Sequence, residues 1–416
     1  MEIKKIKVGV FGVGRGLDIA KNFMLLNAEI VAICDNHKGR REEAIKKLGK
    51  SVKDFENFDD FINYPMDAVI LANNFYEHAE FAIKCFEKNI HVFCECLSNG
   101  TMGEGVKLIR AFEKSKSIYM LAENYPQMLH NREIKRVIDT GNLGEIMYAE
   151  AEYNHPVNPW YTYFTKKYKF YPEHWRHFLP KTYYITHSLG PVMYLTGATP
   201  KKVSAFAMFF PIKGDVPTAS HNGDKASNIT TLNDDGSVFR VTASSCFGAH
   251  NNSTRVCGTK GQIENLRGMG DQIMLRYNEW EKPENEPVEK LYTPSWNDKD
   301  EEIIKQSGHG GADYVTARMF LDCVDKGIQP PHPFDVYSAT AMSSVGILAH
   351  RSVLDGGKVY EIPDFRNEED RKLYENDFLT PFYSSKGDAP TIPCCSHTDY
   401  KPTEKQMELY FKELEK

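Results

Sequence analysis

Short apolar runs alternate with helical patterns through the first third of the chain. The runs are Ile6–Gly12, Glu29–Asp35, Ala68–Ala72, His91–Cys94 and Ile118–Ala122. Segments between them, such as His78–Glu87 and Glu104–Lys114, carry apolar residues at the spacing of a helix. Strands that are apolar throughout suit a parallel sheet covered by helices on both faces. The alternation therefore predicts an α/β fold with a doubly wound parallel sheet.

Beyond Asn124 the pattern changes. Helices are predicted near 128–140, 313–327 and 336–354, whereas the strand-like segments 146–153, 202–209, 237–244 and 255–258 follow one another without regular helices between them. The turn Asn233–Gly236 has the composition of a hairpin connection. This pattern indicates an α+β domain built on a mostly antiparallel sheet.

We therefore expect three parts: a nucleotide-binding α/β domain at 1–125, an α+β substrate and oligomerisation domain at 126–365, and a polar extension at 366–416. The extension ends in a predicted helix at 405–415 and is expected to wrap either the body of the protein or a partner subunit.

Composition narrows the class of protein. The chain has 416 residues, 41% of them hydrophobic, and a net charge of −6 without a long basic run, so we expect no nucleic-acid partner. The longest apolar runs are strand-sized and the N-terminus lacks a secretory segment, so we expect no membrane association. Nine cysteines are too few for a disulfide scaffold, which favours a reduced, cytoplasmic enzyme.

The turn after the first strand carries the first chemical signal. It reads Gly12-Val-Gly14-Arg15-Gly16, in which glycines allow a tight turn and let a pyrophosphate approach the backbone and the next helix N-terminus. Asp35 ends the second strand, where a carboxylate can accept hydrogen bonds from a ribose diol. These features predict bound NAD. Asp35 disfavours the 2′-phosphate of NADP, although Arg40 and Arg41 leave that cofactor as a less favoured alternative.

Aromatic residues are concentrated between Trp160 and Trp175, interleaved with three lysines. Such rings can stack on sugar faces or fill a core or subunit contact, and the composition of the segment leaves both readings open.

Together these motifs resemble the Gfo/Idh/MocA oxidoreductases over about residues 5–365. The matching pieces are Gly12–Gly16, Asp35, Glu95, Asn124, Gly141–Gly144, Trp175-Arg176 and Gly258–Gly261. The resemblance implies a Rossmann domain followed by a domain with an open antiparallel sheet, hydride transfer between NAD(P) and a hydroxyl of a sugar or cyclitol, and a homodimer or homotetramer formed through the open sheet.

Two positions depart from that family. Cys96 stands where a lysine is common, and Tyr183 stands where an aspartate precedes the retained His187. Lys181 is a candidate replacement for one of these lost functions.

A closer resemblance is to the NAD-dependent glycosidases typified by bacterial α-N-acetylgalactosaminidase. It rests on Tyr153-Asn-His155, Tyr184–Pro191, Gly308–Asp313, Glu123–Tyr125 and Ile362–Phe365. The implied catalytic residues are Tyr153, His155, Tyr184 and His187, with Tyr125 and His309 as substrate contacts. The implied cofactor contacts are Gly12, Gly14, Arg15, Gly16, Asp35, Asn73, Glu95, Glu123, Asn124, Trp175 and Arg176.

The chemistry that these residues imply begins with a base. A sugar hydroxyl is a weak acid, so loss of hydride from its carbon requires removal of the hydroxyl proton, and histidine suits that task near neutral pH. His187 is our candidate base. We expect an NAD(P)-dependent oxidoreductase acting on a sugar, glycoside or cyclitol. The alternatives are a glycosidase that recycles NAD through oxidation, elimination, addition and reduction, and a non-catalytic NAD-binding protein.

Two further stretches, His174-Trp-Arg-His177 and Cys394-Cys395-Ser-His397, contain candidate metal ligands. Neither stretch has a paired Cys-x-x-Cys or His-Glu-x-x-His motif, so we expect no metal ion.

Overall fold

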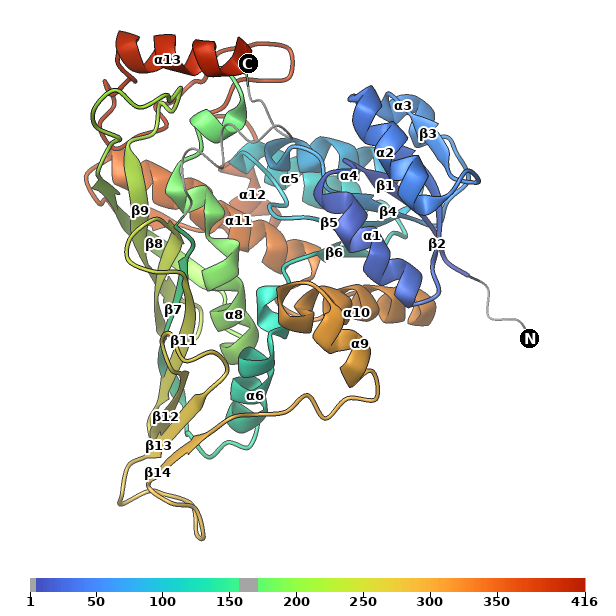
Figure 1. Ribbon diagram of the computed structural model, residues 1–416. Coiled ribbons are helices and arrows are strands. Elements are labelled where there is room, and N and C mark those ends of the chain that lie inside the picture. Colours follow the sequence, from blue (N-terminus) through green and yellow to red (C-terminus); the bar gives the residue numbers. More distant parts are fainter. Residues whose placement is uncertain (1–4, 157–170, 416) are drawn as a thin grey trace.

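The computed structural model describes residues 5–156 and 171–415 (Figure 1). Most of the aromatic segment that begins at Trp160 lies outside the described residues. The expectation of a sugar-stacking platform there therefore stays a prediction.

The first sheet has six parallel strands in the order β3-β2-β1-β4-β5-β6. The strands are β1 Lys7–Phe11, β2 Glu29–Cys34, β3 Lys53–Phe55, β4 Ala68–Leu71, β5 His91–Cys94 and β6 Tyr119–Leu121. All four residues of β4 are buried, as the continuous apolar run predicts.

Helices cover this sheet and connect its strands. They are α1 Arg15–Leu25, α2 Lys38–Leu48, α3 Phe58–Phe61, α4 His78–Glu87 and α5 Met102–Phe112. α10 (Ala312–Lys326) comes from much later in the chain and packs against α1, where Phe320 contacts Phe23 and Phe93 at ring-centroid distances of 5.9 and 5.2 Å. The first domain core therefore includes a helix from the second part of the sequence.

The second sheet has nine strands in the order β14-β13-β12-β11-β7-β10-β9-β8-β15. The strands are β7 Ile146–Asn154, β8 Pro200–Phe209, β9 Asp224–Asn233, β10 Val238–Ser245, β11 Asn251–Gly258, β12 Gly261–Asn265, β13 Ile273–Tyr277, β14 Glu289–Tyr292 and β15 Tyr360–Glu361. Among the strand pairings of the described residues in this sheet, β7–β10 alone is parallel, so the prediction of a mostly antiparallel sheet is confirmed.

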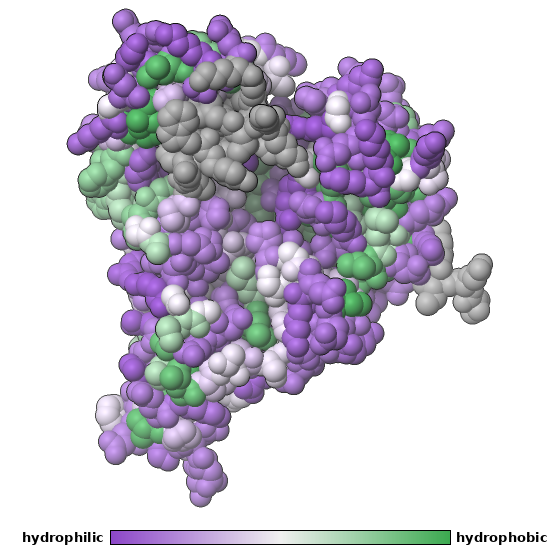
Figure 2. Space-filling model, in the orientation of Figure 1, coloured by the Kyte–Doolittle hydropathy of each residue, from purple (hydrophilic) through white to green (hydrophobic). Residues whose placement is uncertain are grey.

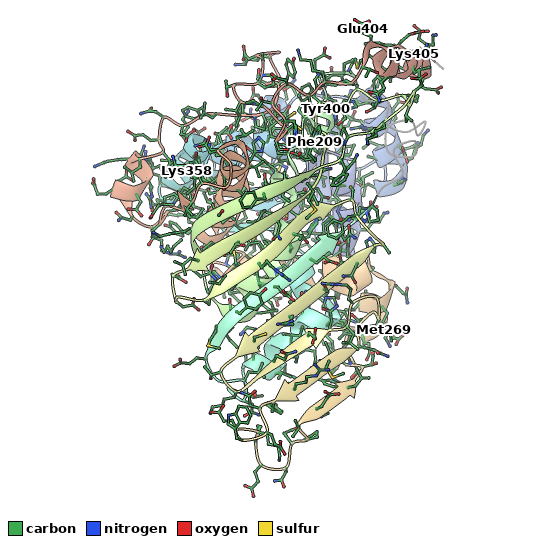
Figure 3. The ribbon with its side chains drawn as sticks, turned by 90° about the vertical axis from the view of Figure 1, so that its left-hand side faces the viewer. Phe209, Met269, Lys358, Tyr400, Glu404 and Lys405 are labelled. Atoms are coloured by element: carbon green, nitrogen blue, oxygen red, sulfur yellow. The ribbon has the colours of Figure 1, made fainter. Side chains whose placement is uncertain are left out.

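One face of this sheet is covered and the other is open. α6 (Leu129–Ile138), α8 (Thr186–Thr196) and α11 (Val336–Leu354) lie between the sheet and the first domain (Figure 1). Ala149, Ala151 and Tyr153 of β7 are buried on the covered face. Glu150 and Glu152 alternate with them and are only half-buried, so they point to the opposite face of the sheet. Figure 3 shows the strands of this sheet from its open side. Tyr153 thus points toward the first domain, which is the geometry that a site residue on this strand needs.

The extension after residue 365 packs on the body of this same chain. It contains α12 (Glu368–Lys372), a long irregular stretch and α13 (Glu404–Glu415). Tyr400 lies against Phe209 at the end of β8, with ring centroids 5.5 Å apart (Figure 3). The extension therefore packs on the body of the protein, which is one of the two arrangements expected for it.

The short helix α9 (Glu301–Gln306) precedes α10 in the chain.

Within the described ranges, no helix combines the length and apolar character needed to span a bilayer. All nine cysteines are free thiols.

Candidate active site

A cleft of about 1430 Å³ opens at the carboxyl ends of the parallel strands. Its walls come from both domains, from Gly12 and Asp35 on one side to Tyr153, His187 and His309 on the other. Open α/β sheets bind their ligands at this edge. Figure 2 shows that hydrophilic residues cover most of the surrounding face.

The glycine turn fits a pyrophosphate. Gly12 has a φ of +87°, and a Cβ there would lie 2.3 Å from the carbonyl oxygen of Ala72. Gly14 has open space where a Cβ would stand, and a Cβ at Gly16 would lie 2.7 Å from Cγ1 of Val10. Gly16 therefore provides the close helix–strand packing expected of the third glycine, although it stands one position early.

Asp35 is held rigidly beside this turn. Its side chain is 5% exposed, and its two carboxylate oxygens accept hydrogen bonds from the backbone N–H groups of Val13 (3.1 Å) and His37 (2.8 Å). Arg40 Nη1 is 4.0 Å from the carboxylate. The carboxylate lines the cleft where the ribose of a dinucleotide is expected.

His187, which lines the cleft, is paired with the buried Glu123 at the other end of the cleft. Nδ1 of His187 lies 2.9 and 3.0 Å from the two carboxylate oxygens, and Glu123 is fully buried. Burial alone raises the pKa of Glu123, but the charge and hydrogen bond of His187, together with bonds from Thr186 and the Tyr125 N–H, bring it below its ordinary value. A carboxylate that accepts from Nδ1–H leaves Nε2 as the basic nitrogen.

Three tyrosines surround His187. Tyr125 stacks on the imidazole at 4.2 Å, and the rings of Tyr153 and Tyr184 meet it edge-on at 4.8 and 5.2 Å. Burial raises the pKa of all three phenols well above the ordinary value. They are therefore hydrogen-bond donors near neutral pH, which leaves base chemistry to histidine.

His155 also reaches the cleft and is paired with a residue that the sequence motifs did not indicate. Its Nδ1 is 3.0 Å from Nδ1 of His250, in the loop between β10 and β11. Burial, followed by the charges of His250, His187 and His309, lowers the pKa of His155. His250 stands in no motif of the sequence, so only the fold reveals the pairing.

Asp313 joins several of the candidate residues. Its buried carboxylate accepts hydrogen bonds from Arg15 Nη2 (2.7 Å) and Asn124 Nδ2 (2.6 Å), and lies 3.1 Å from Nδ1 of His309. Burial raises the pKa of Asp313, but the bonds with His309 and Arg15 outweigh burial and depress it strongly. Asp313 ends the Gly308–Asp313 motif, in which the predicted substrate contact is His309.

The remaining predicted contacts are distributed along the cleft walls. Glu95 lines the cleft, and burial raises its pKa despite the nearby Arg15. Cys96 donates from Sγ to Glu123 over 3.2 Å. Other lining residues are Asn73, Trp175 and Arg176. Lys181 is not among the lining residues, and its role as a replacement for one of the lost functions stays a prediction.

The stretches considered as metal ligands have other roles. His177 bonds the hydroxyl of Tyr410 over 2.9 Å, and Cys394 Sγ donates to the carbonyl of His221 over 3.3 Å. Residues 5–156 and 171–415 contain no cluster of three potential metal ligands.

Three family models match the chain. Residues 6–123 match the Gfo/Idh/MocA oxidoreductase family model, described as an NAD-binding Rossmann fold, and residues 131–264 match a Gfo/Idh/MocA C-terminal domain. Residues 212–370 match the C-terminal domain of glycosyl hydrolase 109. The two Gfo/Idh/MocA models together span more than half of the chain.

Curated relatives agree with these matches. A glycosyl hydrolase family 109 protein of Shewanella sp. (strain W3-18-1) is 25% identical over 409 residues, covering 86% of this chain and 85% of the relative. The α-N-acetylgalactosaminidase of Shewanella oneidensis is 24% identical over 421 residues, covering 88% and 86%.

Solved structures share the fold. A levoglucosan dehydrogenase in complex with NADH and levoglucosan has a TM-score of 0.69 at 16% identity, covering 86% of this chain and all of that one. The WlbA dehydrogenase of Bordetella pertussis, in complex with NADH and UDP-GlcNAcA, has a TM-score of 0.65 at 17% identity, covering 87% and 99%. The chain belongs to the Gfo/Idh/MocA oxidoreductase family and lies near its glycosyl hydrolase 109 branch.

Proposed function

We propose that this protein removes hydride from a ring hydroxyl carbon of a sugar or glycoside, with His187 as the base that takes the hydroxyl proton. The observation that carries the proposal is the contact between His187 Nδ1 and the buried carboxylate of Glu123, which leaves Nε2 as the basic nitrogen in a histidine that lines the cleft.

NAD fits the residues at the other end of the cleft. Gly12 permits the tight turn, Gly14 leaves open space where a pyrophosphate can approach the backbone, and the carboxylate of Asp35 lines the cleft, where it can accept hydrogen bonds from a ribose diol. The side-chain oxygen of Asn73 lies buried at the cleft without a hydrogen-bond partner among the described residues, so a ligand can supply one. When bound, NAD supplies the acceptor, and later the donor, of a hydride. Asp35 favours NAD over NADP because its carboxylate repels a 2′-phosphate.

The net reaction that we favour is glycoside hydrolysis. The relatives named above include an α-N-acetylgalactosaminidase, and residues 212–370 match the glycosyl hydrolase 109 domain. Once a ring carbon is a ketone, the neighbouring C–H becomes acidic and a histidine can remove its proton, which lets the anomeric group leave. His155 lines the cleft, and its lowered pKa keeps it neutral and able to accept a proton.

The alternative net reaction is a simple sugar dehydrogenation that releases the ketone. The two are separated by incubating the purified protein with a panel of aryl glycosides and free sugars, with and without added NAD. Aryl release without accumulation of NADH supports the glycosidase. Stoichiometric NADH without aryl release supports the dehydrogenase. A protein that binds NAD and does neither would be a non-catalytic NAD-binding protein.

We also propose that a second copy of the chain covers the open face of the nine-stranded sheet. Phe206 and Leu232 on this face are 64% and 43% exposed, beside the ion pair between Arg240 and Glu150. Apolar side chains with neighbouring charge pairs suit a specific interface. Light scattering on the eluting protein tests this, and a monomer at micromolar concentration would contradict it.

A further inference from the structure

The C-terminal extension crosses both domains. The three matching family models end at residues 123, 264 and 370, so this segment lies almost wholly beyond them. Asp377 anchors it to each side. Its carboxylate bonds Arg351 of the second domain, with Nη2 to Oδ1 at 2.6 Å, and its carbonyl accepts from the N–H of Gly103 in the first domain over 2.7 Å.

Phe382 of the extension lies behind one wall of the cleft. That wall is the single 3₁₀ turn Phe75–Glu77, whose residues all line the cleft. Phe382 is 1% exposed, stacks on Tyr76 with centroids 5.3 Å apart and planes 17° apart, and meets Phe75 edge-on at 5.2 Å. The two cleft-lining rings are therefore packed against a side chain from the extension.

The next residue supports a second turn of the same wall. Tyr383 meets Phe178 edge-on at 5.1 Å, and Phe178 directly follows the 3₁₀ turn Trp175–His177. Trp175 contacts Phe75 at 4.8 Å, so the two turns support one another. From α13, the hydroxyl of Tyr410 bonds Nε2 of His177 over 2.9 Å.

Ser385 brings the extension to the cleft itself. It is a lining residue, and its side chain hydrogen-bonds the carboxylate of Glu77. Glu77 also bonds the side chains of Asn73 and Asn74. Ser385 thus joins the group of polar residues that faces the expected cofactor.

We propose that Phe382–Ser385 is part of the cofactor site, in which Phe382 and Ser385 are positioning residues that fix the wall formed by Phe75–Glu77 and Trp175–His177. Without Phe382, the rings of Phe75 and Tyr76 each lose one packing partner and regain freedom that cofactor binding must then remove. The extension therefore sets the affinity and the dissociation rate of the dinucleotide. This inference rests on the proposed use of NAD.

The test is a calorimetric titration of NAD into three full-length variants, Phe382→Ala, Phe382→Leu and Ser385→Ala. Phe365→Ala is the matched control, because Phe365 is also almost fully buried, at 2% exposed, but is not the residue that packs against the cleft-lining rings of Phe75 and Tyr76. We expect Phe382→Ala to weaken NAD binding by about tenfold or more and Phe382→Leu by less, because leucine keeps part of the apolar volume. Ser385→Ala should raise Kd about threefold, whereas Phe365→Ala should stay within about twofold of the unaltered protein.

Two results would overturn the inference. One is an unchanged NAD affinity in Phe382→Leu and Ser385→Ala, which remain informative if Phe382→Ala does not fold. The other is an equal loss of affinity in the Phe365→Ala control, which would reduce the effect to general destabilisation. If the unaltered protein does not bind NAD, the proposed function fails together with this inference. If the unaltered protein binds NAD and the Phe382 and Ser385 variants bind it equally well, only the proposed role of the extension is excluded.

Discussion

Nδ1 of His187 lies 2.9 and 3.0 Å from the two carboxylate oxygens of Glu123, which come from segments 64 residues apart in the sequence. Glu123 follows β6 of the first domain, and His187 stands in the first turn of α8 in the second. A Cβ at Gly190 would lie 2.8 Å from Cγ of Glu123, so the helix can approach the carboxylate only because that position is glycine. The pair thus depends on the docking of the two domains.

Glu123→Gln should lower kcat by about 10²-fold or more, because a neutral amide neither stabilises the imidazolium nor fixes Nδ1 as the protonated nitrogen. NAD binding should change little, because the structure buries Glu123 behind His187 and not in the lining of the cleft, unlike the cofactor contact that the resemblance implies. Initial rates with a glycoside that the unaltered protein cleaves measure kcat, and calorimetric titration with NAD measures the affinity for the cofactor. Glu113→Gln, which changes a carboxylate that pairs with Arg371 outside the cleft, is the control. Equal rates in the Glu123→Gln variant and the unaltered protein would exclude Glu123 as the partner of the base.

Asp35→Ala should weaken NAD binding by about tenfold or more, because a ribose loses its charged acceptor. The substitution also removes the acceptor of the Val13 and His37 N–H groups, so the thermal midpoint should be recorded beside the affinity. NADP should lose less affinity than NAD, since the repulsion of the 2′-phosphate disappears at the same time. If both cofactors lose affinity equally, Asp35 acts on the turn rather than on the ribose.

Much of the fold can be predicted from the hydrophobic pattern. α4 and α11 begin and end where the pattern places them, because α4 has an apolar face that must be buried and α11 is buried on nearly all sides. β12, β13 and β14 were not predicted, since each of these strands near the sheet edge spans only four or five residues. β13 alternates between buried and more exposed positions, but over a single short run, and β14 has no buried residue. Local periodicity carries little signal in such strands.

The site could be predicted only as a set of residues. Motifs identified the glycine turn, Asp35 and His187, because each is a local pattern with a known chemical use. The pairing of His155 with His250 and the bonds of Asp313 with Arg15 and Asn124 join distant segments, and no spacing in the sequence encodes them. The same holds for Phe382, whose neighbours Phe75 and Tyr76 lie some 300 residues earlier.

Stability should fall as the pH drops from about 6.5 to about 4. Burial lowers the pKa of His78, His177 and His350 to about 4. Their folded-state pKa values lie below the unfolded value, so the unfolded chain takes up protons first. The stability that their neutral forms contribute is complete above pH 6.5 and is lost through this window, at about 1.4 kcal/mol per pH unit for each histidine.

Urea unfolding at about pH 7.5, 5.5 and 4.5 gives the free energy of unfolding at each pH and so measures this loss. His350→Gln should flatten the dependence by about one proton, since glutamine keeps a donor for the Pro393 carbonyl but does not titrate. An unfolding free energy that stays constant between pH 7.5 and about 4.5 would contradict the assignment.

Turnover in deuterium oxide separates elimination from simple oxidation. If a histidine removes the proton next to the transient ketone, its N–H exchanges with solvent before the proton is returned, so the sugar product should carry deuterium at that carbon. His187→Ala should abolish both turnover and incorporation, since oxidation must precede acidification of the C–H. Mass spectrometry and proton NMR of the product locate the label. Aryl release without any incorporated deuterium would exclude the elimination route even where NAD is required, because hydrolysis would then have to proceed without breaking the neighbouring C–H bond.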